Sequence, residues 1–388
     1  MKINLFSVEK MCNRSRYQHK LSRLNFNNNI LEAFFFVPWA RLQQMRIETA
    51  TLKDIAKALG LSTSTVSRAL RDRYEISEET KKLVVAYANK VNYRANPIAR
   101  SLKERRSYSL GIIVSEIANN FFSQVINGIE SIAYNKDYHV IISQSHESFK
   151  QEKLNVEHLA SRSIDGLLIS LSAETQDITY LKELYAQGLP IVFFDRVPKE
   201  FETHKVVANN FKGAFDATEH LILSGNKVIA HLTGSEMLSN TKERLEGYQA
   251  ALAKHHIPFN PDLVKYCQHG GMLIEELDAA VKDLLLLKPQ GIFIANDRLT
   301  TGCLTALKNV SPVLSHKIAI AGFTNSNVVN LFSPSLTSVR QPAFEMGQVA
   351  TELLIQMIET KRPITEFQTR VLDTEIISLK DAPRDPIA

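Results

Sequence analysis

The feature that most constrains the fold is a regular alternation of short apolar runs and amphipathic helical stretches, which starts near Ser109. The apolar runs recur roughly every 25–30 residues, as expected of repeated βαβ units. They are apolar throughout, so we expect both faces of each strand to be buried, as in parallel sheets. The region is long enough for two doubly wound lobes with a ligand cleft between them. The predicted strands are Leu110–Val114, Val140–Ser143, Gly166–Ser170, Ile191–Asp195, Val228–Leu232, Gly291–Ala295 and Ile318–Phe323.

A different pattern precedes this alternation. Three short helices are predicted, each after a hydroxyl residue that can accept a hydrogen bond from a backbone N–H of the first turn. Gly60 ends the first helix, the second covers Thr63 to Leu70, and the third runs to about Asn89. Two short helices joined by a tight turn and braced by a third predict a helix-turn-helix. The capping residues are Thr51, Ser62 and Ser77, and Asp54 completes a variant of the capping box with Thr51.

The basic charge lies at this end of the chain. Residues 45–106 contain 14 Lys and Arg against 7 Asp and Glu, whereas residues 107–388 contain 25 against 32. A basic module joined to an acidic body favours binding of a polyanion through one end only.

Residues 1–44 show no helical or strand period, and we interpret them as either a disordered arm or the product of an upstream start, with Met45 as the true initiator. Their apolar run, Ala33 to Ala40, is too short to span a membrane. It could be mistaken for a signal peptide, but secretion would place the basic module outside the cell. The cysteines, Cys12, Cys267 and Cys303, show no paired spacing for a disulfide or a zinc site. We therefore expect a cytoplasmic protein without membrane contact.

Several motifs, in order along residues 47–377, resemble those of the LacI/GalR family of bacterial regulators. The resemblance implies an all-α headpiece followed by a two-lobed α/β domain of the periplasmic-binding-protein type. The motifs are Gly60-Leu61-Ser62-Thr63-Ser64-Thr65-Val66-Ser67-Arg68-Ala69-Leu70, Asn92-Tyr93, Ala99-Arg100-Ser101-Leu102, Ala118-Asn119-Asn120-Phe121-Phe122, Asp165-Gly166-Leu167-Leu168, Phe194-Asp195-Arg196, Arg244-Leu245-Glu246-Gly247-Tyr248, Ala295-Asn296-Asp297 and Leu336-Thr337-Ser338-Val339-Arg340-Gln341-Pro342.

The resemblance also implies how the headpiece meets DNA. Base edges in the major groove would be read from the second helix, and neighbouring hydroxyls would contact phosphate. The leucine of the linker would wedge into a central base step of the minor groove, or alternatively pack between domains. The implied base-reading residues are Thr63, Ser64 and Arg68; the other DNA-binding candidates are Thr51, Ser62, Thr65, Ser67 and Ser77 in the headpiece and Asn96, Ala99 and Leu102 in the linker.

For the larger domain, the resemblance implies an effector site between the lobes, in which planar donors and acceptors surround sugar hydroxyls beside an apolar face. The implied residues are Phe121 and Phe122 at the cleft mouth, Asp195 at a strand end, and Arg244 and Asp297 on the opposing lobe. Asn120, Gln144 and Asn240 are weaker candidates, and each could equally be a strand-end residue that satisfies backbone groups. Gly322-Phe323-Thr324 departs from the more usual Gly-Phe-Asp, so the effector itself is not implied.

We therefore expect a headpiece at residues 45–94, a hinge linker at 95–108 and a sensing domain at 109–388 whose chain crosses between lobes near 209–212 and 322–340. The expected protein is a homodimer that binds a pseudo-palindromic double-stranded operator and responds to a small molecule, for which the resemblance implies a sugar or a derivative. The sequence contains no metal-site pattern, cofactor motif, phosphate loop or nucleophile elbow that would point to an enzyme. Two alternatives remain: a secreted sugar-binding protein, which the headpiece argues against, and a regulator that answers to a partner protein.

Overall fold

The computed structural model describes residues 50–93, 101, 106–310, 317–326, 336–360 and 366–378. Its contacts divide the chain into two compact units, Met1–Asn96 and Pro97–Ala388. The linker candidates Asn96, Ala99 and Leu102 lie outside the described residues, as do residues 1–44. Among the described helices, none is both long enough and apolar enough to cross a bilayer.

In the first unit, the described residues 50–93 form a bundle of three helices, α4 (Leu52–Leu59), α5 (Thr63–Leu70) and α6 (Glu78–Lys90). The predicted helices are confirmed, and so are their caps. Thr51 and Asp54 form the reciprocal capping box, and Gly60 ends α4 in the left-handed conformation with φ 65°. The helices enclose a small core of Ile55, Ala56, Val66, Ala69, Val84 and Ala88.

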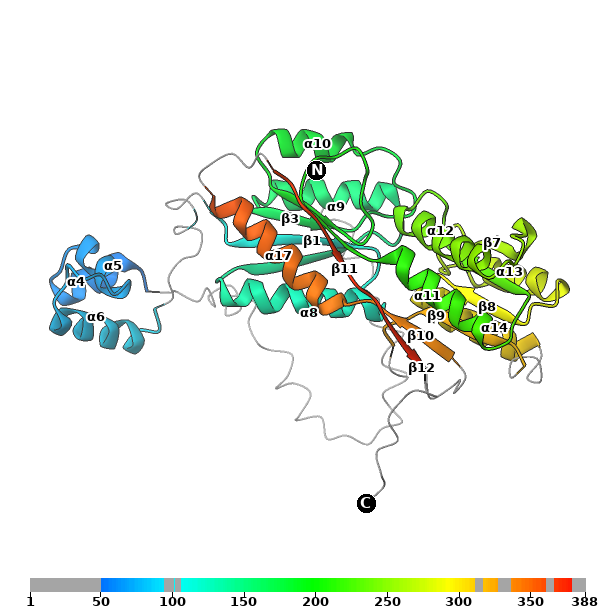
Figure 1. The fold of residues 1–388 in the computed structure, drawn as a ribbon. Coiled ribbons are helices and arrows are strands. Elements are labelled where there is room, and N and C mark those ends of the chain that lie inside the picture. The colour runs from blue at the N-terminus through cyan, green and yellow to red at the C-terminus, as the bar shows by residue number, and fades with distance from the viewer. Residues whose placement is uncertain are drawn as a thin grey trace, which may run out of the picture. The chain divides into compact units, whose positions relative to one another are not determined.

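The second unit contains two six-stranded sheets (Figure 1), each belonging to one lobe. Sheet A has the order β11-β5-β4-β3-β1-β2, and sheet B has the order β12-β10-β9-β8-β6-β7. All pairs are parallel except β10 with β12, an antiparallel pair at the edge of sheet B. The strands are β1 (Ser109–Val114), β2 (His139–Gln144), β3 (Gly166–Ile169), β4 (Ile191–Phe194), β5 (Lys205–Ala208), β6 (Ile229–Thr233), β7 (Val264–Tyr266), β8 (Gly291–Ile294), β9 (Ala319–Phe323), β10 (Leu336–Arg340), β11 (Thr369–Leu372) and β12 (Glu375–Ser378).

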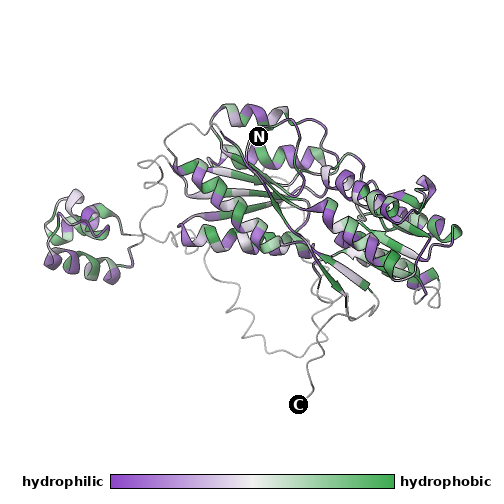
Figure 2. Ribbon diagram, in the orientation of Figure 1, coloured by the Kyte–Doolittle hydropathy of each residue, from purple (hydrophilic) through white to green (hydrophobic). Residues whose placement is uncertain are grey.

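Helices cover both faces of each sheet and bury the predicted apolar strands, except for β2 at the edge of sheet A, which is only half-buried. In the first lobe, α8 and α17 pack on one face of sheet A, and α9 and α10 pack on the other. In the second lobe, α13 and α14 cover one face of sheet B, and α11 and α12 cover the other. Figure 2 shows hydrophobic strands in the middle of each lobe. The helices are α8 (Asn120–Asn135), α9 (Phe149–Ser161), α10 (Thr179–Ala186), α11 (Asn210–Leu223), α12 (Ser239–Lys254), α13 (Ile274–Leu286), α14 (Asp297–Val310) and α17 (Ala343–Glu359), with a 3-10 turn η3 at Pro261–Leu263.

Along the described residues, the chain passes between the two lobes at three places. It leaves sheet A after β5 and enters α11 at Asn209–Asn210, and it returns after β10 through Gln341–Pro342 into α17. A third passage, at Asp373–Thr374, joins β11 to β12. The second passage follows the predicted stretch 322–340, and the third was not predicted.

The start of the second unit is anchored by one carboxylate. Asp165 accepts hydrogen bonds from the backbone N–H of Ser107 at 2.8 Å and from that of Tyr108 at 2.8 Å. The Ser107 hydroxyl adds a third at 3.1 Å. The end of the predicted linker is therefore fixed to sheet A at the amino end of β3.

Candidate nucleic-acid interface and effector site

Helix α5 presents the residues expected to read DNA. Val66 and Ala69 are buried against the other two helices. Thr63, Ser64 and Arg68 lie on the opposite face and are exposed. A short, rigid helix with hydroxyls and one guanidinium on its free face has the dimensions and the donors needed in a major groove.

Three of the other candidates serve first as helix caps. The Ser62 hydroxyl accepts from the Thr65 N–H at 3.0 Å and also bonds the hydroxyls of Ser64 and Thr65. The Ser77 hydroxyl accepts from the Thr80 N–H at 3.3 Å. Together with Thr51, these residues fix the starts of all three helices, so their capping role is shown by the geometry. Ser67 and Thr65 are half-buried on the sides of α5.

Arg68 has an intramolecular partner in the headpiece. Its Nη1 lies 3.4 Å from the Glu75 carboxylate, and both side chains are largely exposed. A pair of this kind stabilises the fold by at most about 1 kcal/mol. It does hold the guanidinium toward the α5–α6 loop, where it competes with any base edge for the same N–H groups.

In the larger unit, one ion pair connects the loops at the carboxyl end of sheet A. The Glu147 carboxylate accepts from Arg196 Nη1 at 2.6 Å and from the backbone N–H of Ala173 at 2.8 Å. It also accepts from the Ser115 side chain. Burial works to raise the pKa of Glu147, but the Arg196 charge and the hydrogen bonds from Arg196, Ala173 and Ser115 together outweigh it, and the pKa is lowered. A single carboxylate thus joins the loops after β1, β2, β3 and β4.

Asp195, the first residue after β4, reaches the second lobe. Its backbone is left-handed with φ 59°, a strained conformation for a residue with a side chain. Its Oδ1 accepts from Asn240 Nδ2 of α12 at 3.4 Å, and its Oδ2 lies 3.8 Å from Arg196 Nε. The predicted candidates Asp195 and Asn240 therefore meet across the lobes, and both are buried.

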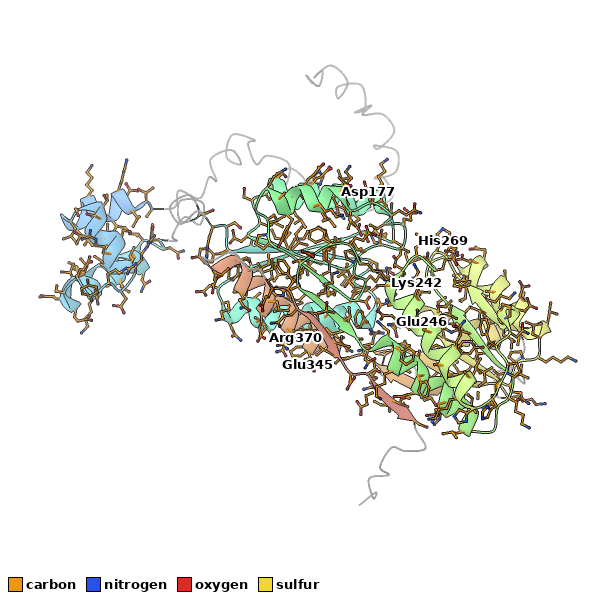
Figure 3. All side chains as sticks on the ribbon, turned by 45° about the horizontal axis from the view of Figure 1, so that its top comes forward. Asp177, Lys242, Glu246, His269, Glu345 and Arg370 are labelled. Carbon is orange, nitrogen blue, oxygen red and sulfur yellow. The ribbon has the colours of Figure 1, made fainter. Side chains whose placement is uncertain are left out.

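Arg244 is the central cation of the second lobe. Its Nε and Nη2 donate to Asn210 Oδ1 at 3.0 and 2.7 Å, and Nη1 donates to the carbonyl of Ala295. The guanidinium lies over the ring of Phe323, 3.8 Å from the centroid. Among the described residues no carboxylate pairs with it, although Asp195 and Glu243 raise its pKa against the effect of burial, which lowers it to about 10. Lys242 and Glu246, labelled in Figure 3, lie on the exposed face of the same helix.

Asp297 begins α14 on the same side of sheet B. Its Oδ1 accepts from the hydroxyl of Thr324, the residue after β9. Arg244 contacts Ala295, which is two residues before Asp297, and Phe323, which is the residue before Thr324. The candidates Asp195, Asn240, Arg244 and Asp297 are thereby gathered at the carboxyl ends of the two sheets, where ligands bind in open α/β folds.

The remaining candidates lie apart from this group. Phe121 and Phe122 are 5% and 2% exposed and pack into the core of the first lobe, with Phe122 edge-on to Phe194. Gln144 uses its side-chain oxygen to accept from the Ile117 N–H at 2.8 Å. Asn120 is exposed at the start of α8. Gln144 thereby holds the loop between β1 and α8.

Sequence reasoning missed the residues that support the site. Glu147 lies in the loop after β2, a strand that was predicted without its loop, and Asn210 follows β5, which was not predicted. A signal was available for Asn210, which stands within the lobe crossing predicted near 209–212. Among the described residues, no group of three or more His, Cys, Asp or Glu is arranged to hold a metal.

The two lobes touch each other beside the site. Glu116, after β1, forms an ion pair with Arg298 of α14, and the Val197 N–H donates to the Ser239 hydroxyl at 3.3 Å. A separate cavity of about 780 Å³ lies at the amino ends of β3 and β4, lined by Arg106, Asp165 and Met357 among others. Arg106 and Asp165 belong to the anchor of the linker, and the cavity holds none of the residues expected to bind an effector.

Two family models match the chain in the order of its two units. Residues 51–96 match bacterial regulatory proteins of the lacI family. Residues 107–377 match the periplasmic binding proteins and sugar binding domain of the LacI family. The chain belongs to the LacI family of bacterial regulators. It is accordingly a DNA-binding transcriptional regulator controlled by an effector, with a helix-turn-helix headpiece and a periplasmic-binding-protein-like domain.

Individual proteins agree with this assignment. The HTH-type transcriptional repressor PurR of Photobacterium profundum is 31% identical over 316 residues, which cover 80% of this chain and 93% of that protein. The transcriptional regulator CelR in complex with cellobiose is 26% identical, with a TM-score of 0.61 over 84% of this chain and 98% of its own. The lac repressor dimer bound to operator and an anti-inducer is 22% identical, with a TM-score of 0.73 over 85% and 98%, and it shows the shared fold.

Proposed function

We propose that this regulator acts as a homodimeric repressor that binds a pseudo-palindromic operator and is switched by a small molecule held between the two lobes. The observation that carries the proposal is the gathering of Asp195, Asn240, Arg244 and Asp297 at the facing carboxyl ends of both sheets. These four polar side chains come from both lobes, so a ligand that they hold must change how the lobes sit against each other. A ligand switches the protein only through a difference in affinity between the two arrangements, typically about 1–3 kcal/mol.

For the DNA end, we assign base reading to Thr63, Ser64 and Arg68 on the free face of α5. Thr65 and Ser67, and the helix starts capped by Thr51, Ser62 and Ser77, would meet phosphate, because the N-terminal N–H groups of helices attract anions. Asn96, Ala99 and Leu102 would form the hinge against the minor groove. Two headpieces on one operator require two copies of the chain, and the operator places the protein in the cytoplasm. The proposal includes no catalytic step.

The test is fluorescence anisotropy of the full chain on the DNA upstream of its own coding sequence and on scrambled DNA of the same length, over a salt series. Tight binding that prefers the native DNA and weakens with salt is the expected result. Equal, weak binding to both DNAs at every salt concentration would contradict an operator-specific repressor. Light scattering of the same sample tests the dimer.

A further inference from the structure

One cavity has no part in the function proposed above. It occupies about 780 Å³ in the first lobe, at the amino ends of β3 and β4, whereas the candidate effector residues lie at the carboxyl ends of the strands. Small-molecule pockets commonly occupy about 300–1,000 Å³. The cavity is therefore large enough to hold a ligand of its own, and the residues that line it indicate which kind.

One wall of the cavity is apolar. It is formed by Leu184 near the end of α10, by Leu189 and Pro190 in the turn before β4, and by Met357 and Ile358 near the end of α17. All five are half-buried. Half-buried apolar side chains keep surface that a ligand can cover, and removing that surface from water favours binding. The wall therefore fits a ligand with a hydrocarbon body.

Three helices end at the cavity, and their ends make it electronegative. Ser161 is the last residue of α9, Gln187 is the C-cap of α10, and Ile358 is the last residue but one of α17. The C-terminus of a helix carries about half a negative charge, which a basic side chain in the last turn can offset. Neither α10 nor α17 has a basic residue in its last turn. A cation in the cavity is therefore stabilised by more than one helix.

The charged side chains of the cavity are also mostly negative. Among the described residues that line it, they are the carboxylates of Glu157 and Asp165 and the guanidinium of Arg106. Asp165 is held by the N–H groups of Ser107 and Tyr108. Glu157 is exposed and, within the described part of the chain, has no hydrogen bond or ion pair. Its carboxylate is therefore available to a cation.

The guanidinium of Arg106 does not supply that cation. Its Nη2 donates to the Ile358 carbonyl at 2.9 Å, and its Nη1 lies 3.9 Å from the Glu359 carboxylate. Arg106 thus serves as the missing basic residue for the end of α17. Among the described residues that line the cavity, no other basic side chain is left for the end of α10 or for Glu157.

We propose that this cavity is a second ligand site, for an organic amine whose charged group is attached to an apolar body. The ammonium group donates to the Glu157 carboxylate and to carbonyl groups at the helix ends, and the body covers Leu184 and Met357. An acid or a phosphate ester is repelled by the same charges. A neutral compound gains only the apolar contact.

The site also borders the anchor of the linker. Arg106 directly precedes Ser107, which Asp165 holds, and an ammonium group that reaches the Ile358 carbonyl competes with Arg106 for it. Loss of this contact frees the end of the linker and raises the entropy cost of placing the headpiece on DNA. An amine in the cavity therefore weakens DNA binding.

The experiment compares compounds of one shape and different charge on the full chain, by titration calorimetry at neutral pH and constant ionic strength. Phenethylamine, phenethyl alcohol and phenylacetate share a ring, and hexylamine, hexanol and hexanoate repeat the comparison without one. We expect an amine to bind at least about tenfold more tightly than its alcohol, and the acid to bind more weakly still. Equal affinities of amine and alcohol would overturn the inference, and so would the absence of binding by both amines at millimolar concentration.

Two substitutions tie the binding to the cavity. Glu157→Gln removes the free carboxylate and should weaken the amine about fivefold or more, whereas Gln187→Glu adds a carboxylate at the end of α10 and should tighten it by a similar factor. Glu130→Gln, at an exposed position of α8, is the matched control and should bind the amine as the unmodified chain does. Unchanged affinity in both cavity variants would contradict the site. Loss of binding in Asp297→Asn, with binding kept in Glu157→Gln, would place the amine between the lobes and would also overturn the inference.

Fluorescence anisotropy on the native DNA tests the effect on the linker. A saturating amine should lower the DNA affinity of the unmodified chain about threefold or more, and the matching alcohol should not. Arg106→Ala should lose this response, because it has no guanidinium for the amine to displace. Bound amine that leaves the DNA affinity unchanged would overturn the link to the linker. Because the calorimetry needs no DNA, failure of this site and failure of the proposed repressor are told apart.

Discussion

The guanidinium of Arg244 donates two hydrogen bonds to one acceptor, Oδ1 of Asn210, at 3.0 and 2.7 Å. Asn210 is buried and is the first residue of α11, directly after the chain leaves the first lobe. Its Nδ2 donates to Glu243 at 2.8 Å. Nδ2 of the preceding residue, Asn209, donates at 2.9 Å to Asp373, which lies in the third passage between the lobes. The orientation of the central cation is therefore fixed by the passages that must move when the lobes move.

Asn210→Ala should destabilise the larger domain by about 1–3 kcal/mol, because two buried N–H groups of a charged side chain lose their acceptor. The free energy of unfolding from urea titration measures this loss. Asn226→Ala is the matched control, since Asn226 makes one side-chain bond to a backbone carbonyl at 2.8 Å and should cost about 1 kcal/mol or less. Equal costs for the two variants would argue against a special role for Asn210.

A second relationship joins the lobes through amide groups. Gln124 of α8 and Asn325, after β9, exchange two hydrogen bonds, of 3.2 and 2.8 Å. Asn325 also accepts from the Gln341 N–H at 3.1 Å and donates to the Gln341 carbonyl at 2.8 Å. Asn325 therefore connects the first lobe to the second passage, one residue beyond Thr324.

Gln124→Ala should loosen this connection with little loss of global stability. We expect faster hydrogen exchange at the Gln341 amide, which Asn325 protects, and a cost in unfolding free energy of about 1 kcal/mol. Gln348→Ala removes a bond of 3.3 Å within the first lobe and is the control. Unchanged protection at Gln341 in the first variant would rule out the connection as a restraint.

The Arg68–Glu75 contact leads to a prediction at the DNA end. Glu75→Gln and Glu79→Gln each remove one exposed negative charge from the headpiece, but only Glu75 holds Arg68. Both variants should bind all DNA somewhat more tightly, because repulsion from phosphate falls. Only Glu75→Gln should gain additional affinity for native over scrambled DNA, by up to about 1 kcal/mol. Anisotropy titrations measure both, and identical gains would mean that Glu75 does not restrain Arg68.

Arg68→Ala tests the base-reading assignment directly. Loss of a guanidinium that reads a base edge should reduce the preference for native over scrambled DNA by about 1–3 kcal/mol. Affinity for scrambled DNA should fall much less. An equal loss on both DNAs would place Arg68 on phosphate instead.

Much of the fold could be predicted because its strands are buried on both faces. Runs such as those of β3, β4 and β8 are apolar at every position, and each was found within one or two residues. β11 escaped prediction because Thr369, Arg370 and Val371 are all exposed at a sheet edge, so no apolar run marks it. β7 has three residues, too few for a period.

The candidate site was predictable only in part, because some of its contacts join residues that are far apart in the sequence. Asp195, Asn240, Arg244 and Asp297, which the structure brings close together, were predicted as candidates because they stand at strand ends or in motifs of the family. Glu147 and Asn210 were not found, because their importance comes from contacts with residues far away in the sequence, such as Arg196 and Arg244. Phe121 and Phe122 show the converse case: the motif is present, but the rings fill the core of the first lobe.

The last prediction concerns His231, a buried residue of β6 whose ring stacks on Phe293 with centroids 4.7 Å apart and on Tyr248 at 5.1 Å. Burial lowers its pKa from 6.5 to about 3, so the imidazole is neutral in the folded state. The unfolded state binds a proton below pH 6.5 and the folded state does not, so stability is present above that pH and is lost as the pH falls below it. The loss should approach about 2 kcal/mol at pH 5, at about 1.4 kcal/mol per pH unit.

His231→Phe keeps an aromatic ring in the stack and removes the titration, so its unfolding free energy should fall less between pH 7.5 and 5. His139→Phe, at an exposed position, controls for the loss of a histidine. Parallel pH profiles for the unmodified chain and His231→Phe would show that His231 does not make the domain sensitive to acid.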